Sequence, residues 1–347
     1  NVFIRCDRLG KGVTVEDFYP WRSKYERCNI TLSDAFGVAD LFALNNKLPI
    51  PCSTVTLNLK TLLPVVDVSF LTGVTDLSVG RVEDCLLVVP PRVVSIKLSE
   101  DSQGVSLAGT DNLTSLTACD QRACHVSCPQ LRELGWTGGL LSAKRVPLRF
   151  SDAPHLSSMT VCADSIKPTF AFPPRLSTLS LDLRRGVDVA ALTPLGCLQE
   201  LDISVDGDGD PLDLSALTSL TRLNANKSPV ARLPGSLVEC RVSLESSFDF
   251  RGFTRLTKLR TTLDPDVRLL FPTQLRKLVI RQGHGDGHLD ESNIGAVALE
   301  TLTFFPWLTP LTARELGVLP KTLRTIHASF DPASLEDSLG DVFPHMR

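Results

Sequence analysis

Apolar residues recur along most of this chain with a spacing that predicts short strands joined by tight turns. The fullest form is an apolar residue, a proline and three further apolar positions, as in "VPPRVVSIKL" from residue 89 and "FPPRLSTLSL" from residue 172. A second form replaces the proline lead with Leu-Thr or a similar pair, as in "LTSLTRLNA" from residue 217. The closing apolar-x-apolar triplet has period two, which is the pattern of a strand with one buried face.

The pattern occurs fourteen times between residues 50 and 330. Successive units are 17 to 25 residues apart, mostly near 20. A unit of this length cannot bury its own apolar side, whereas stacked units share one continuous core, so we predict a solenoid. Aligned on the third apolar position, the units place in one column Leu57, Leu77, Ile96, Leu116, Leu134, Met159, Leu179, Leu201, Leu223, Cys240, Leu259, Leu278, Leu302 and Ile326.

These motifs resemble the leucine-rich repeat family, in which L-x-x-L-x-L recurs every 20 to 29 residues or so. The proline-led copies resemble its short LPX-type subtype. The resemblance implies an α/β solenoid, a horseshoe with a parallel sheet on its concave face and mostly short turns or 3-10 segments on the convex side. A parallel β-helix is the competing solenoid, but its coil repeat is shorter than the one found here.

One feature departs from that family. Its members usually have Asn or Cys three residues after the last strand Leu, where the side chain hydrogen-bonds neighbouring backbone turns. Here those positions hold other residues, such as Leu62, Asp101 and Asp206. An Asp can accept a hydrogen bond from a backbone N–H but cannot donate one to a carbonyl, so the asparagine ladder is expected to be mostly absent.

The ends of the chain do not carry the repeat. We predict an N-terminal cap over residues 1–49, with a strand over "NVFIR" and a helix over 33–46; the alternative is the end of a truncated adaptor module. Residues 50–330 form the predicted solenoid. Residues 331–347 form a predicted C-terminal cap, with a short helix over 331–340 that begins at Asp331.

Three segments carry side chains that bind metals in other proteins. In "DGDGDP", Asp206, Asp208 and Asp210 alternate with glycines, but a calcium loop would need Gly and Glu where Pro211 and Leu217 stand. "RQGHGDGHLDES" over 281–292 offers His and Asp ligands but is glycine-rich and follows a predicted strand, whereas "CDQRACHVSC" over 119–128 lacks the paired spacing of a zinc site. We interpret them as a turn, a loop and free thiols, and expect no metal.

No phosphate-binding glycine motif and no Gly-x-Ser-x-Gly elbow occurs in the chain. We therefore expect no enzyme activity, no catalytic residues and no cofactor. A net charge of −3 and a pI near 6.1 argue against binding to nucleic acid. No stretch is uniformly apolar enough to span a membrane.

Ten cysteines are too few for a disulfide scaffold in a chain of 347 residues. Reduced thiols and a cytoplasmic location are the preferred interpretation. The alternative is a secreted or cell-surface protein, which would carry paired cysteines and glycans at the sequons of Asn29, Asn112 or Asn226.

Outward positions of four successive repeats carry cations, whereas the preceding repeat carries Glu200 and Asp202. Neighbouring strands would gather these cations into one patch, which suits an acidic protein partner; a solvated face is the other interpretation. Phe305 and Trp307 would add an aromatic contact. The predicted partner-binding residues are Arg222, Arg241, Lys258, Arg260, Lys277, Arg281 and Phe305.

The predicted function is thus a non-enzymatic protein–protein interaction module that binds a partner on its concave face. Two alternatives stay open. One is the substrate-recognition subunit of a ubiquitin-ligase complex, whose catalytic part would lie in another chain. The other is the secreted or surface recognition protein.

Overall fold

The computed structural model divides into two compact units, Asn1–Leu176 and Ser177–Arg347, which are described separately. Within them the structure describes residues 2–6, 27–32, 53–59, 64–80, 84–99, 102, 104–119, 128–141, 153–166, 170–185, 189–206, 211–244, 247–263, 268–282, 292–305 and 318–327.

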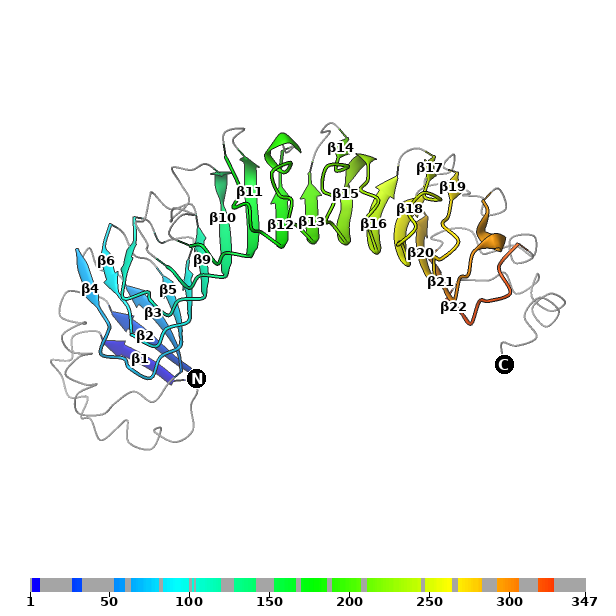
Figure 1. The fold of residues 1–347 in the computed structure, drawn as a ribbon. Coiled ribbons are helices and arrows are strands. Elements are labelled where there is room, and N and C mark those ends of the chain that lie inside the picture. The colour runs from blue at the N-terminus through cyan, green and yellow to red at the C-terminus, as the bar shows by residue number, and fades with distance from the viewer. Residues whose placement is uncertain are drawn as a thin grey trace. The chain divides into compact units, whose positions relative to one another are not determined.

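The first unit is built on one parallel sheet whose strands are neighbours in chain order (Figure 1). Short strands between them form a second parallel sheet. The main strands are β1 (Val2–Cys6), β2 (Arg27–Leu32), β3 (Thr54–Leu59), β5 (Asp76–Gly80), β7 (Ser95–Leu98), β9 (Ser115–Cys119), β10 (Glu133–Leu141) and β11 (Ser158–Ile166). The second sheet has β4 (Val65–Asp67), β6 (Leu86–Val88) and β8 (Ser106–Ala108).

The second unit repeats this arrangement, again with every described pairing parallel. Its main strands are β12 (Thr178–Leu183), β13 (Glu200–Val205), β15 (Arg222–Arg232), β16 (Glu239–Leu244), β18 (Lys258–Leu263), β20 (Lys277–Gln282), β21 (Thr301–Phe305) and β22 (Thr325–His327). Outside this row, β14 (Leu212–Asp213) pairs with the end of β15, and β17 (Phe248–Asp249) pairs with β19 (Leu269–Leu270).

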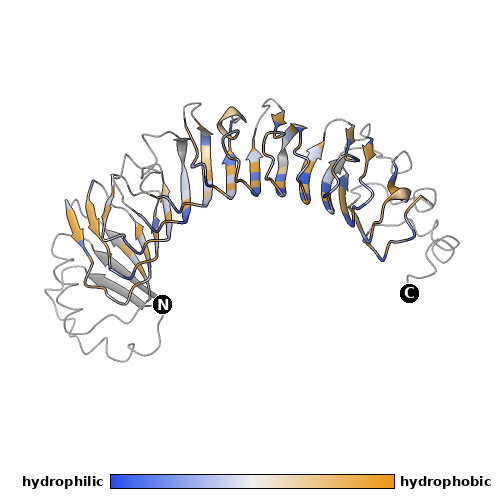
Figure 2. Ribbon diagram, in the orientation of Figure 1, coloured by the Kyte–Doolittle hydropathy of each residue, from blue (hydrophilic) through white to orange (hydrophobic). Residues whose placement is uncertain are grey.

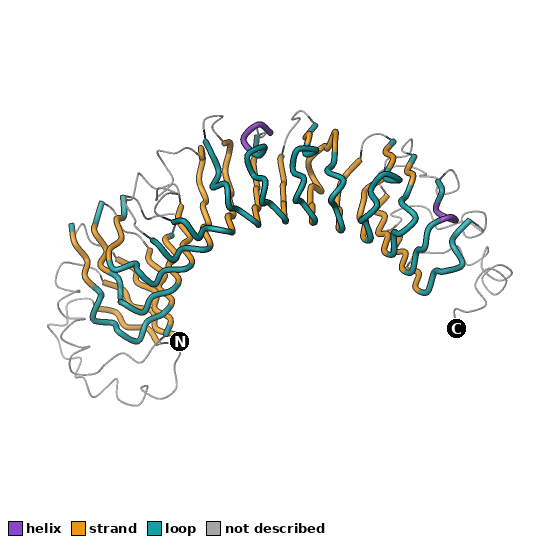
Figure 3. Tube along the Cα trace, viewed as in Figure 1, coloured by secondary structure: helices purple, strands orange, loops and turns teal. Residues whose placement is uncertain are grey.

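Each unit is therefore a parallel β-solenoid. The predicted α/β class is not supported: the described residues contain two 3-10 helices, η3 (Val189–Ala191) and η4 (Ile294–Ala296), and no α-helix (Figure 3). The 3-10 segments predicted for most turns are thus seen at two of the described turns only. The described segments between successive main strands are short, and most of their residues are in extended conformation, so they leave no room for an α-helix. The helices predicted over 33–46 and 331–340 lie outside the described residues.

The core of each unit comes from the inward face of its strands. In β13 the burial alternates strictly, so that Leu201, Ile203 and Val205 are buried between more exposed neighbours. The same alternation appears as blue and orange bands along the central strands of the second unit (Figure 2). Full burial of one such side chain contributes about 1.5–3 kcal/mol. The period-two triplets of the sequence are confirmed as these strands.

The predicted alignment is confirmed for the described strand pairs within each unit, with one exception. Leu77 pairs in register with Val55, and Leu57 pairs with Val79, so Val55 takes the place predicted for Leu57 and the prediction was wrong by two residues. Val55 and Leu57 are both fully buried. A shift of two residues along a strand keeps the same face inward, and the apolar pattern therefore cannot detect it.

The sheet begins inside the predicted N-terminal cap. The strand over "NVFIR" is confirmed as β1, and β2 is a further strand that we did not predict. Both run parallel to β3, with Val2 opposite Cys28 and Cys28 opposite Val55. The division of the chain at residues 49 and 330 into caps and a solenoid stays a prediction.

Two kinds of turn lead from the short strands outside the main sheets, such as β4 and β6, back to the main strands. The short kind carries a proline such as Pro90 or Pro272, which has no N–H to satisfy. In three longer turns an Asp accepts the N–H two residues ahead: Asp67 from Ser69 at 2.9 Å, Asp213 from Ser215 at 3.0 Å, and Asp249 from Arg251 at 2.9 Å. Pro and Asp are thus alternative solutions for the same backbone position.

Hydroxyl groups connect successive turns at the corner before the main strands. Thr114 Oγ1 donates to the carbonyl of Val94 at 3.1 Å, and Thr221 Oγ1 donates to that of Gln199 at 3.1 Å. Each carbonyl also accepts two backbone N–H groups of the following turn. The corner thus holds turn-to-turn contacts of the kind that an asparagine ladder supplies elsewhere.

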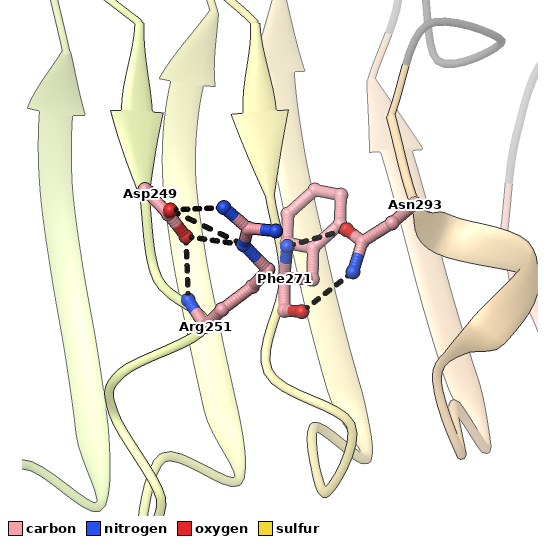
Figure 4. Close-up of polar contacts among 4 residues, drawn as sticks. All are labelled: Asp249, Arg251, Phe271 and Asn293. Atoms are coloured by element: carbon pink, nitrogen blue, oxygen red, sulfur yellow. Dashed lines mark hydrogen bonds and ion pairs between the residues drawn. The ribbon is translucent and has the colours of Figure 1, made fainter.

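One asparagine does connect two turns, through both atoms of its amide. Asn293 Oδ1 accepts the N–H of Phe271 at 2.6 Å, and its Nδ2 donates to the Phe271 carbonyl at 2.9 Å (Figure 4). One turn earlier, the N–H of Phe250 donates instead to the backbone carbonyl of Leu270. The Asn293 side chain therefore takes the place of a further strand, which would otherwise pair with the backbone of Phe271 directly after β19.

We expect Asn293→Ala to lower the free energy of unfolding by about 1–2 kcal/mol, because it leaves both backbone groups of the buried Phe271 without partners. Urea denaturation followed by circular dichroism measures this change. The matched control is Asn112→Ala, which removes one exposed side-chain bond to the Pro91 carbonyl and should change stability by less than about 0.5 kcal/mol. Equal effects of the two substitutions would contradict the role given to Asn293.

The turn at Asp249 predicts a pH dependence. Hydrogen bonds from the Arg251 side chain and backbone lower the pKa of the Asp249 carboxyl (Figure 4). The stability that this carboxylate adds is present above its ordinary pKa of about 4 and is lost as the pH falls through the lowered value. We therefore expect Asp249→Asn to lower the melting temperature at pH 7 and to have a smaller effect at pH 2. Thermal melts at both pH values test this, and an equal effect would contradict it.

Candidate functional site

A hollow of about 650 Å³ lies on the outward face of the second unit's main sheet. It crosses strands β12, β13, β15, β16, β18 and β20. Outward side chains form most of its lining: Thr178, Ser180, Glu200, Asp202, Arg222, Asn224, Glu239, Arg241, Lys258, Arg260, Lys277 and Val279.

The register of the strands arranges these side chains in two rows. The first row is Thr178, Glu200, Arg222, Glu239, Lys258 and Lys277, and the second row is Ser180, Asp202, Asn224, Arg241, Arg260 and Val279. Neighbours in a row belong to strands about 4.8 Å apart. Charges alternate along most of the first row, whereas the second row changes once from acid to cation.

Ion pairs compensate most of the first row. Arg222 Nη1 lies 2.7 Å from Glu200 Oε1, and Lys258 Nζ lies 3.5 Å from Glu239 Oε2. These groups are largely exposed, so each pair contributes at most about 1 kcal/mol to stability. Lys277 comes next, beside Lys258 in register, and has no ion pair among the described residues.

The second row is compensated only at its acidic end. Asn224 Nδ2 donates to Asp202 Oδ1 at 2.9 Å. Beyond it, Arg241 and Arg260 face each other in register, and the Nε of each is buried without a hydrogen-bond partner in the described structure. Burial lowers the pKa of Arg260, and the nearby charges of Arg241 and Arg281 lower it further. The Arg260 guanidinium therefore lies in a field that disfavours its charge.

Arg281 and Phe305 lie beside the hollow, one position further along their strands. They are opposite each other in register, and the Arg281 guanidinium carbon lies 6.0 Å from the centre of the Phe305 ring. This distance is within the range of a cation–π contact. Phe305 is 50% exposed, which is unusual for a phenylalanine in this fold.

The structure places the seven predicted binding residues on one face. Arg222, Arg241, Lys258, Arg260 and Lys277 line the hollow, and Arg281 and Phe305 border it. Their role in binding stays a prediction, and Trp307 lies outside the described residues.

The sequence analysis did not include the start of the hollow on β12. Thr178 and Ser180 line it there, and Val279 separates Lys277 from Arg281. The same alignment of repeats would have found all three, because they occupy outward positions of aligned triplets. The prediction took only charged and aromatic residues from those positions.

The three segments that we weighed as metal sites and interpreted as a turn, a loop and free thiols fall mainly on residues that the structure does not describe, 207–210, 283–291 and 120–127. Within the described residues, no three side chains of His, Cys, Asp or Glu gather as metal ligands do. Nor does any helix of that part of the chain have the length and apolar character needed to cross a membrane.

Cys240 lies beneath the hollow, at the inward position that is leucine in most repeats. It is 1% exposed, and burial raises the pKa of its thiol. Burial also raises the pKa of Cys85 and of Cys128 to about 11, with a further contribution from Asp84 at Cys85. These three thiols are thus both inaccessible and protonated at neutral pH.

We expect iodoacetamide at pH 8 to modify the exposed Cys197 in the folded protein and to leave Cys85, Cys128 and Cys240 unmodified until the chain is unfolded. Peptide mass spectrometry before and after addition of guanidinium measures this. The unfolded sample is the control for intrinsic reactivity. Modification of Cys240 in the folded protein at the rate of Cys197 would contradict the described packing beneath the hollow.

Comparison with known proteins finds likenesses to solved structures, with nine matching chains. No family model matches the chain, and no curated protein matches it. A solved structure titled "The crystal structure of CroV588 a novel circular LRR protein structure" has a TM-score of 0.43 and 15% sequence identity. The match covers 86% of this chain and 51% of that chain, so this chain spans about half the length of that structure. The description of the fold therefore rests on the strands and register of the chain itself.

Proposed function

We propose that this chain is a non-enzymatic protein-interaction module of the leucine-rich-repeat kind, which binds an acidic segment of a partner protein in the hollow of its second unit. The repeat pattern and the parallel solenoid support this proposal. The observation that carries it is the uncompensated positive charge of Arg241, Arg260 and Lys277 in an open hollow.

The size of the hollow suits a segment of a protein. It crosses six neighbouring strands, which at about 4.8 Å between strands is roughly 24 Å. An extended peptide rises about 3.3 Å per residue, so about seven residues would fill this length. The face that we predicted to be concave is the one that contains the hollow.

The lining is suited to binding and poorly suited to proton transfer. Its cations at the second-row end are guanidinium groups, which hold their protons throughout the physiological range and cannot act as general bases. Asp202 and Glu200 at the opposite end are engaged by Asn224 and Arg222. The end of the hollow that carries the uncompensated cations therefore attracts an anionic partner, and the charge of these cations would steer the association.

Charge reversal tests this proposal. The variant Arg241→Glu, Arg260→Glu and Lys277→Glu should lose the partner that the unchanged chain captures from its native source, with affinity reduced at least about tenfold, or about 1.4 kcal/mol. Capture followed by mass spectrometry identifies the partner, and titration of the purified partner measures the affinity.

The control carries the same change of charge outside the hollow, at the exposed residues Arg255, Lys321 and Arg324, each changed to Glu. Circular dichroism must show that all three proteins fold. Capture of the same partner by both variants would contradict binding in the hollow. Loss from both would show that net charge alone governs the association.

A further inference from the structure

Three arginines on successive strands form a cluster at the basic end of the hollow. Arg241 on β16 and Arg260 on β18 are neighbours in register. Arg281 on β20 lies one outward position further along, and its charge acts on Arg260 together with that of Arg241. We call Arg241, Arg260 and Arg281 the arginine cluster.

The protein itself supplies no anion to this cluster within its described residues. The nearest acids in the rows, Glu200 and Glu239, are paired with Arg222 and Lys258. Asp202 accepts a hydrogen bond from Asn224. Arg241 and Arg260 line the open hollow, and the Nε atom of each is buried without a hydrogen-bond partner among the described residues. Like charges gathered in this way destabilise the free protein, and a bound anion would relieve the repulsion.

The number and geometry of the arginines favour a phosphate over a carboxylate. A carboxylate has one negative charge and two oxygens, whereas a phosphate monoester carries about −1.5 to −2 charges at pH 7 and three acceptor oxygens. Guanidinium groups bind such oxygens through two N–H groups at once. Three arginines on neighbouring strands therefore offer enough donors for three oxygens.

The surroundings of the cluster favour a phosphate that is attached to a peptide. Phe305, half exposed against Arg281, and Val279, beside Arg260 in register, give the cluster an apolar border. A free phosphate would leave this border unused. The rest of the hollow extends past Arg241 to β12, which gives room for the residues on one side of a modified side chain.

We propose that the arginine cluster binds a phosphorylated side chain of the partner protein, with Phe305 contacting the neighbouring residue of that partner. This inference rests on the proposed function and adds to it the chemistry of the bound group. Phosphorylation of the partner would then control its binding to this protein.

The test uses pools of fluorescent nine-residue peptides with randomised flanks and a fixed central residue: phosphoserine, phosphotyrosine, glutamate or serine. Fluorescence anisotropy with the full chain, at about 0.15 M salt, measures their affinities. We expect at least one phosphorylated pool to bind about tenfold or more tightly than the glutamate pool. Arg260→Gln should weaken that binding at least about tenfold.

Two further variants test whether binding depends on a guanidinium group at position 260 or only on positive charge. Arg260→Lys keeps the charge and loses the planar guanidinium, so the preference for phosphate over glutamate should fall while folding is unchanged. Arg255→Gln removes an exposed arginine outside the hollow and should leave all affinities unchanged. An equal loss with Arg255→Gln would overturn the assignment of the cluster.

Other outcomes overturn the inference without removing the proposed function. If the glutamate pool binds as tightly as both phosphorylated pools, and the triple charge-reversal variant loses it, the hollow binds acidic peptides and the phosphate is not recognised. If inorganic phosphate alone binds the cluster as tightly as the peptides do, the cluster is a site for a free anion. If no pool binds while the captured partner still needs the hollow, the partner is recognised without a phosphorylated side chain.

Discussion

The structure depends on the parallel register between successive turns. A single turn cannot bury its own apolar residues, and only a neighbour in register covers them, as Leu201 of β13 does for Leu223 of β15. The same register fixes the outward side chains, because residues opposite each other on adjacent strands are about 4.8 Å apart. Packing inside the solenoid therefore decides which charges meet on its surface.

The turns satisfy the hydrogen-bonding groups of their backbone in several ways, so residues of different types occupy equivalent positions. In one turn, Asp67 accepts the backbone N–H of Ser69. In the next turn, the corresponding residue is Pro90, which has no N–H to satisfy. Asn293 goes further and replaces a whole strand pairing with one side-chain amide. Each device leaves the main sheet unchanged, so turns of different length stack without disturbing the outward rows.

The sequence predicted the main sheet well because period two and the 20-residue spacing are local signals. It did not predict the short strands outside the main sheet of each unit, such as Val65–Asp67 and Leu269–Leu270, which are too short to show alternation. The role of Asn293 depends on a partner 22 residues away and leaves no local pattern. At the site, the search for charged residues selected the cations and passed over Val279, although the predicted alignment of Leu259 with Leu278 already places Val279, rather than Arg281, beside Arg260.

The contrast between the two rows of the hollow separates stability from function. On the same strands, the first row alternates Glu200, Arg222, Glu239 and Lys258, which shows that this sheet accommodates opposite charges side by side. The second row places Arg241 against Arg260, although an acid at either position would remove the repulsion. The first row keeps opposite charges side by side as far as Lys258, where Lys277 follows, and the second row breaks this rule at Arg241 and Arg260. Like charges side by side at an open surface are expected where binding rather than folding sets the residues.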